Sequence, residues 1–191
     1  MITLLHQKTK QLSELLLEGA AVLTAYTEGD YAFDRKTVDL LEKAHRYYTE
    51  AQQPDHVAKV CTCQADVVTL SRGYHPQTFL KIERERRSVR STQTYRSVQQ
   101  LLLVLEEDYV KVVSKLEASE ELVKQLVLNV LQMQIIDEAT LRNRSSQEDL
   151  ETIWKRIGQE PNLNLFQKKI ILNSSSTDSL ILLDQVLSQL F

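Results

Sequence analysis

The chain has 191 residues, of which 42% are hydrophobic and 26% charged, and its formal net charge is −3. These values are typical of a globular protein with a buried core, and no apolar run is long enough to span a bilayer. The chain has only four Gly and three Pro. Because sheets and their tight turns depend on these two residues, their scarcity favours long helices and few turns.

The first third of the sequence predicts three helices. Apolar residues spaced by three and four indicate a first helix from about residue 2 to residue 27, followed by Gly29. Asp34 is suited to cap a second helix that continues to Pro54, with Val38 on its apolar face. A third helix follows Pro54, and Gly73 is placed to terminate it. The second and third helices are expected to form an αα-hairpin.

The strongest pattern lies between residues 95 and 137, which contain neither Gly nor Pro. One position in every three or four is apolar over more than five heptads, and only Ser119 interrupts the series. The pattern predicts one continuous helix over 95–137. Its expected buried positions are Tyr95, Val98, Leu102, Leu105, Tyr109, Val112, Leu116, Val123, Leu126, Val130 and Met133.

The last third predicts shorter helices. Ser146 and Asp149 are spaced as a capping box, and Gly158 is expected to end the helix that they begin. Residues 162–173 fit either a helix or a strand. Thr177 is expected to cap a terminal helix that is apolar on nearly every side, which is typical of a helix buried in its own chain or in a partner. The residues expected to dock a partner helix are Leu180, Leu183, Leu187 and Phe191.

These elements predict an all-α fold, an elongated helical bundle built on one long central helix with a small C-terminal helical appendage. The expected domains are a bundle over 1–137 and an appendage over 138–191. The apolar residues of the long helix are spaced as in a coiled coil. Their stripe is wider than a two-helix seam, so we expect more than one helix to pack against it.

No motif of an enzyme is present, so we expect a protein without catalytic, cofactor-binding or metal-binding residues. Cys61 and Cys63 point to nearly opposite faces of a helix, so they are expected to be buried core residues. His56 and His75 lie close by in sequence and leave zinc as the minor alternative. Two cysteines so close together are poorly placed to form a disulfide, and the N-terminus does not fit a signal peptide. Both features favour a cytoplasmic location.

The segment 81–97 is strongly basic in an acidic chain, with six basic and two acidic residues and a net charge of +4. If the segment has no binding role, it is a solvated helix face, a mobile loop, or an arm that pairs with an acidic patch of the same chain, such as residues 106–108. The functional alternatives are contact with nucleic acid or with an acidic protein partner. The residues expected to make such contacts are Arg84, Arg86, Arg87, Arg90 and Arg96.

The sequence therefore favours a non-enzymatic assembly or adaptor subunit that binds another protein chain or a second copy of itself. The alternative is a small helical subunit of a nucleoprotein complex that binds RNA or single-stranded DNA through residues 81–96.

Overall fold

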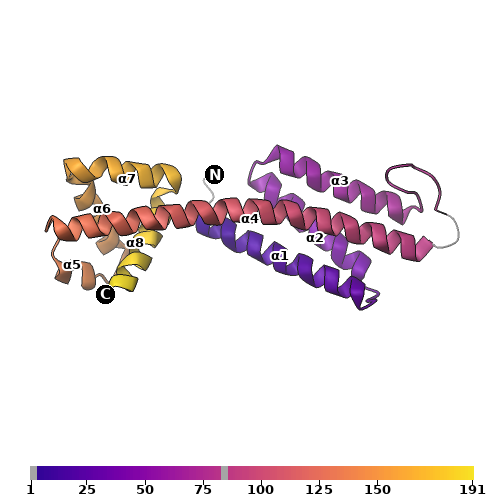
Figure 1. Cartoon of the computed structure of the whole chain (residues 1–191), viewed down its shortest axis with the longest axis horizontal. Coiled ribbons are helices and arrows are strands. Elements are labelled where there is room, and N and C mark those ends of the chain that lie inside the picture. Colours follow the sequence, from indigo (N-terminus) through magenta and orange to yellow (C-terminus); the bar gives the residue numbers. More distant parts are fainter. Residues whose placement is uncertain (1–3, 83–85) are drawn as a thin grey trace. The chain divides into compact units, whose positions relative to one another are not determined.

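The computed structural model describes residues 4–82 and 86–191, and in these ranges every regular element is a helix (Figure 1). The prediction of an all-α fold with a long central helix is confirmed. The helices are α1 (Leu5–Thr27), α2 (Phe33–Glu50), α3 (Pro54–Ser71), α4 (Arg86–Gln132), α5 (Glu138–Arg142), α6 (Gln147–Gln159), α7 (Pro161–Asn173) and α8 (Ser176–Leu190).

The long helix α4 is continuous over 47 residues, although its bounds differ from those predicted. It begins at Arg86, ahead of Tyr95, where the predicted apolar series starts. It ends at Gln132, and Gln134 has a left-handed backbone (φ 54°) that ends helical geometry. Met133 is consequently 47% exposed and does not belong to the buried face.

The chain divides into two compact units, residues 10–110 and residues 1–9 with 111–191. The sequence predicts a boundary at residue 137, where the apolar series of the long helix stops. The division into these two compact units falls within α4, and one part of this helix completes the core of each unit.

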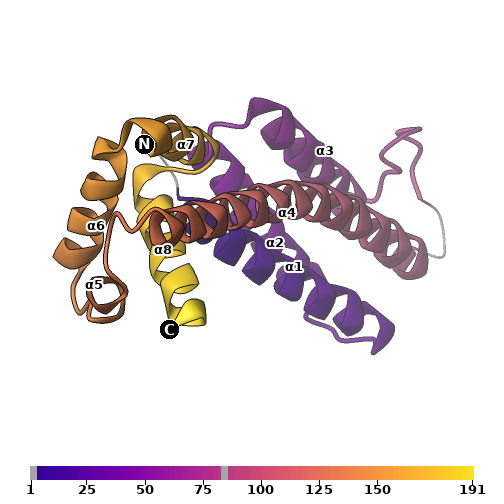
Figure 2. The ribbon, with the colours of Figure 1, turned by 60° about the vertical axis from the view of Figure 1, so that its left-hand side comes forward.

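In the 10–110 unit, α2 and α3 form the predicted hairpin and α1 runs beside α4 (Figures 1 and 2). Gly19 makes the approach of α1 to α4 close, because a Cβ at this position would meet the side chain of Leu102. Tyr26 packs on Tyr95, with ring centroids 4.6 Å apart. The core of the unit is closed by apolar residues of all four helices, including Leu12, Val22, Leu40, Tyr48, Val60, Leu70, Val98, Leu101 and Leu105.

The α2 helix begins one residue before Asp34, so Asp34 lies in its first turn and is not its N-cap. The carboxylate of Asp30 instead accepts a hydrogen bond from the N–H of Ala32 (2.8 Å). The buried face of α2 contains Thr37, Leu40 and Leu41, whereas Val38 is 43% exposed. The prediction is therefore wrong for Val38, whereas Ala44 and Tyr48, which continue the same spacing, are buried as expected.

In the 111–191 unit, α6, α7 and α8 surround the C-terminal part of α4 (Figure 2). Residues 162–173, which the sequence left between helix and strand, belong to the helix α7. The core of this unit contains Val123, Leu126, Val127, Val130, Ile136, Leu141, Ile153, Trp154, Ile157, Leu163, Ile170, Leu182, Leu183, Val186 and Leu187.

Two predicted helix ends in this unit differ from the structure. Gly158 lies inside α6 and does not terminate it; a Cβ there would meet the side chain of Gln167, whose amide donates to the carbonyl of Trp154 (2.6 Å). The cap of α8 is Ser175 and not Thr177, because the Ser175 hydroxyl accepts from the N–H of Asp178 (3.0 Å). The capping box of Ser146 and Asp149 is confirmed.

Candidate functional site

A groove of about 500 Å³ lies between the start of α6 and the outer face of α8, within the 111–191 unit. The capping box fixes the start of α6, and the Ser175 cap fixes the start of α8. The apolar side chains in the groove are Leu150, Leu180 and Ile181, all half-buried. Its remaining lining is polar and consists of Arg144, Ser145, Ser146, Gln147, Thr177, Asp184 and Gln185.

Arg144 holds the segment before α6 against α8. Its Nε lies 3.0 Å from Asp184 Oδ1, and its terminal nitrogens donate to the hydroxyl of Ser188 (2.6 Å) and to the carbonyl of Leu141 (3.0 Å). The side chain is only 11% exposed. Because its donors are engaged inside the chain, Arg144 shapes the groove rather than adding an unpaired charge to it.

The four residues predicted to dock a partner helix have different environments. Leu183 and Leu187 are fully buried in the chain's own core, where a partner cannot reach them. Leu180 is half-buried and lines the groove. Phe191 is 40% exposed, with the guanidinium carbon of Arg142 lying 5.2 Å from the centre of its ring. Only Leu180 and Phe191 are therefore accessible for contact with another chain.

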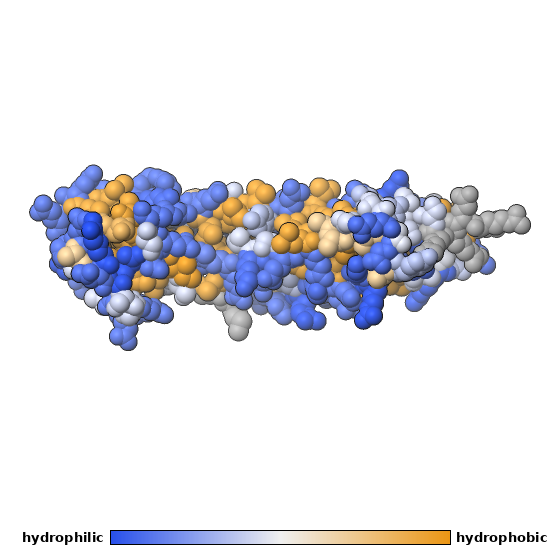
Figure 3. All heavy atoms as spheres, turned by 90° about the horizontal axis from the view of Figure 1, so that it is seen from below, coloured by the Kyte–Doolittle hydropathy of each residue, from blue (hydrophilic) through white to orange (hydrophobic). Residues whose placement is uncertain are grey.

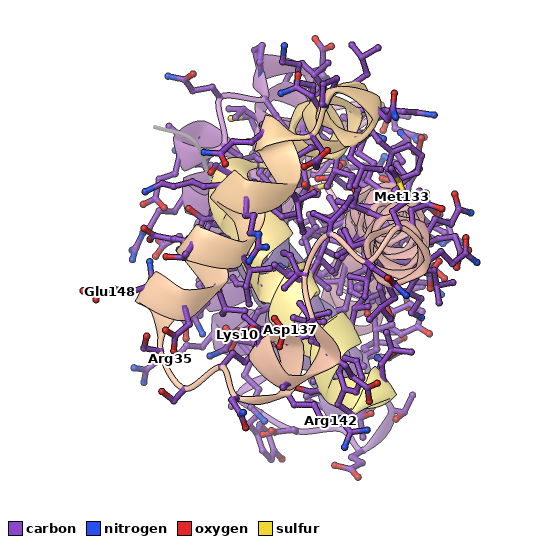
Figure 4. All side chains as sticks on the ribbon, turned by 90° about the vertical axis from the view of Figure 1, so that its left-hand side faces the viewer. Lys10, Arg35, Met133, Asp137, Arg142 and Glu148 are labelled. Atoms are coloured by element: carbon purple, nitrogen blue, oxygen red, sulfur yellow. The ribbon has the colours of Figure 1, made fainter. Side chains whose placement is uncertain are left out.

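A second, more polar hollow of about 370 Å³ lies beside α5 and the first turns of α6. Figure 4 shows Asp137 at the start of α5, with Arg142 farther along and Glu148 pointing outward from α6. The Asp137 carboxylate accepts hydrogen bonds from the N–H (3.0 Å) and the hydroxyl (2.6 Å) of Thr140, and these bonds hold its pKa below the ordinary value. Asp137 therefore acts as a helix cap in this hollow.

The basic segment is helical from Arg86 onward, whereas Lys81 and Ile82 lie in the connection between α3 and α4. Arg84 lies outside the described residues, and Arg86 and Arg87 form the first turn of α4. Arg90 forms an ion pair with Asp34 on α2 (2.5 Å). Arg96 is exposed on α4. Of the two arginines in this set whose side chains the structure describes, Arg90 is thus already paired within the chain.

Polar residues of the same segment also face inward. Thr94 and Ser97 are buried, and the hydroxyl of Thr92 lies 3.1 Å from that of Tyr26. The sequence had suggested that little of this segment could belong to the core, since Val89 and Tyr95 are its only apolar residues between 83 and 97. Thr94 and Ser97 are exceptions, because small hydroxyl side chains fit the close contact between α4 and its neighbours, whereas Arg96 between them is exposed.

The two cysteines differ in environment. Cys63 is buried, and its burial, with Asp66 nearby, raises the pKa of its thiol to about 11. Cys61 is exposed, contrary to the prediction that both cysteines belong to the core. The buried face of α3 is defined by Val60, Cys63 and Leu70, and Cys61 lies on the opposite side. Among the described residues, no group of three or more His, Cys, Asp or Glu side chains is arranged to hold a metal ion.

A buried polar cluster in the 10–110 unit has no counterpart in the sequence analysis. It consists of Tyr47 and Tyr48 on α2 and Asp108 on α4, each at least nine-tenths buried. Neither hydroxyl, nor Oδ2 of Asp108, has a hydrogen-bond partner among the described residues. Burial raises the pKa of both tyrosines, and the neighbouring Asp108 raises it further. The acidic patch predicted over residues 106–108 is therefore reduced to Glu106 and Glu107, which are exposed, whereas Asp108 is buried.

None of the helices in the described parts of the chain is long and apolar enough to cross a membrane. Comparison with known protein families, with curated proteins and with solved structures gave no match to this chain.

Proposed function

We propose that this protein is a non-enzymatic assembly or adaptor subunit, and that it binds a segment of another protein chain or of a second copy of itself in the groove between α6 and α8. The observation that carries the proposal is the groove itself, in which half-buried Leu150, Leu180 and Ile181 are surrounded by polar side chains. An apolar floor with a polar rim is the usual arrangement of a site that accepts an amphipathic helix or an extended segment.

The electrostatics of the groove favour an uncharged segment. Its two charged lining residues, Arg144 and Asp184, are paired with each other. The other polar lining residues are serines, glutamines and a threonine, which donate and accept hydrogen bonds without a net charge. We therefore propose an occupant with one or two apolar anchors and polar flanks.

The alternative function, binding of RNA or single-stranded DNA through residues 81–96, has weaker support. Arg90 is paired with Asp34, and Thr92 and Thr94 contact the chain itself. Fewer groups are therefore available to contact a phosphate backbone than the sequence alone suggested. Arg96, which is exposed, remains a candidate for such a contact.

The test uses a photoreactive amino acid at Gln185, an exposed residue in the lining of the groove, in the full chain expressed in its native host. We expect a crosslinked product of discrete mass after illumination. A product of twice the mass of the chain would identify a second copy, and any other discrete mass a different partner. A Leu180→Glu substitution in the same chain should abolish the product, because it places a charge on the apolar floor.

The matched control is Leu172→Glu, since Leu172 is 85% exposed on α7 and does not line the groove. This control should leave the crosslink intact. A native particle with the mass of a single chain, before and after nuclease treatment, together with no crosslink from Gln185, would contradict the proposed function.

A further inference from the structure

Residues 73–82, between α3 and α4, form a short hairpin. The N–H of Ile82 donates to the carbonyl of Gly73 (2.9 Å), and the N–H of His75 donates to the carbonyl of Leu80 (3.0 Å). Between these bonds, Tyr74 and Lys81 pair as an antiparallel bridge. The ring of His75 also lies 3.5 Å from the side-chain nitrogen of Gln93 on α4. These contacts give the hairpin a defined shape and connect it to the helices of its unit.

The tip of this hairpin exposes two apolar side chains in succession. Phe79 is 72% exposed and Leu80 is 69% exposed. Phe79 has a left-handed backbone (φ 53°), and its N–H donates to the carbonyl of His75 (2.8 Å). A bulky residue rarely adopts this conformation, which costs about 1–3 kcal/mol. A strained backbone that presents a phenylalanine to solvent suggests that the side chain has a use at this position.

The same hairpin is cationic at its base. Arg72 and Lys81 are both exposed, and residues 72–82 contain no acidic residue. The sequence continues with four arginines and two glutamates between residues 83 and 90, and of these arginines Arg90 is paired with Asp34. Apolar residues at a tip and cations at its base are the combination that binds a membrane surface, since one group enters the acyl region while the other meets anionic headgroups.

We infer that the hairpin 73–82 is an anchor that inserts Phe79 and Leu80 into an anionic lipid surface. The fully aliphatic side chain of Leu80, which is as exposed as Phe79, favours lipid over nucleic acid, because a base stacks on an aromatic ring and gains little from a leucine. The inference is independent of the proposed function, since the hairpin and the groove belong to different units.

The experiment is cosedimentation of the full chain with vesicles of two compositions, phosphatidylcholine alone and an equal mixture of phosphatidylcholine and phosphatidylserine. We expect binding to the mixed vesicles, weak binding to the neutral ones, and loss of binding as salt is raised. The Leu80→Ser variant should bind the mixed vesicles about tenfold more weakly, because it loses most of the buried apolar area of that side chain. The Leu172→Ser variant is the control and should bind as the parent chain does.

The Phe79→Asn variant separates anchoring from a structural role. Asparagine tolerates the left-handed backbone, so this variant should melt at the same or a higher temperature while losing vesicle binding. Equal binding to both vesicle types, or unchanged binding by Leu80→Ser and Phe79→Asn, would overturn the inference. So would binding of a single-stranded RNA oligonucleotide without any binding to mixed vesicles, which would assign the hairpin to nucleic acid.

Discussion

The imidazole Nδ1 of His6, near the start of α1, lies 2.8 Å from Oδ1 of Asp178, in the first turn of α8. The other oxygen of this fully buried carboxylate accepts hydrogen bonds from the N–H of Leu5 (2.9 Å) and the hydroxyl of Ser175 (2.8 Å). Asp178 therefore caps α1 as well as bonding to the cap of its own helix. The positive ends of two helix dipoles meet at one carboxylate, which compensates for its removal from water.

The first prediction concerns Asp178 and pH. Burial alone raises the pKa of Asp178, but the hydrogen bonds from His6, Leu5 and Ser175 outweigh it, so the pKa lies below its ordinary value. A lowered pKa in the folded state stabilises the protein above the ordinary carboxyl pKa. The contribution is lost as pH falls below that value through the lowered pKa. Asp178→Asn should cost about 1–3 kcal/mol at neutral pH, measured by chemical unfolding, and less at a pH where the carboxyl is protonated.

The control for this prediction is Asp39→Asn, because Asp39 is exposed on α2. It should change the free energy of unfolding by a few tenths of a kcal/mol at either pH. An Asp178→Asn variant whose cost does not depend on pH would show that the carboxylate charge does not contribute.

The second prediction concerns the packing of α1 on α4. A Cβ at Gly19 would meet the side chain of Leu102, whose Cγ would lie 3.1 Å away. Gly19→Ala should therefore destabilise the protein by about 1–3 kcal/mol through overpacking, even though alanine favours the helix. In a Leu102→Ala background the same substitution should instead stabilise the protein by up to about 1 kcal/mol. A substitution with the same sign in both backgrounds would contradict the close contact.

The third prediction concerns the continuity of α4 at Ala118, an exposed residue in the middle of the helix. Ala118→Pro removes one backbone hydrogen bond and should cost about 3 kcal/mol or more. Ala118→Gly keeps that bond and should cost about 1 kcal/mol. Thermal unfolding followed by circular dichroism gives this ranking, and equal melting temperatures for all three proteins would mean that the helix is interrupted at this point.

The fourth prediction concerns the two thiols. Because Cys63 is buried and its thiol pKa is raised to about 11, its thiolate fraction at neutral pH is about a hundredfold below that of an ordinary cysteine. Cys61 is exposed and should react readily with iodoacetamide. Mass spectrometry of the Cys61→Ser and Cys63→Ser variants measures each thiol separately. Faster labelling of the variant that retains Cys63 would be incompatible with its burial.

The helices were predictable because the apolar spacing of each one is local information. Most of the predicted seam of α4 between Val98 and Val130 is buried, although Leu102, Tyr109 and Leu116 are only half-buried. Ser119, the one polar residue in the predicted series, is fully buried. The Ser119 hydroxyl donates to the carbonyl of Lys115 in the preceding turn (2.8 Å), so it enters the core without an unpaired polar group. Ser119 therefore does not interrupt the helix, as the sequence predicted.

The errors at helix ends arise because a residue's role as a cap or terminator depends on its contacts in the folded chain, which the local sequence does not specify. Ser175 and Thr177 are both good caps, and the sequence does not say which hydroxyl lies beside the N–H of Asp178. Glycine often terminates a helix, but Gly158 is needed for packing, because a Cβ there would meet the side chain of Gln167 on the following helix.

The candidate site depended on information that the sequence does not contain. The sequence does not show which face of α8 is buried. The structure shows that Leu183 and Leu187 pack in the core of the chain, whereas Leu180 is accessible in the groove. The face in Figure 3 shows hydrophobic residues interspersed with hydrophilic ones, so hydrophobicity alone does not identify a docking residue. The pairing of Arg90 with Asp34 joins residues 56 positions apart and was likewise not encoded in any local pattern.

The bond between Leu5 and Asp178 spans 173 positions of the sequence, and this has a consequence for synthesis on the ribosome. Translation produces Leu5 and His6 first, yet their amide groups receive their acceptor only after residue 178 has left the exit tunnel. Until then, the amide groups at the start of α1 bond to water or contact chaperones while the following helices form. An incomplete product that ends before α8 would expose this turn, which makes it a natural place for a protease to recognise unfinished chains.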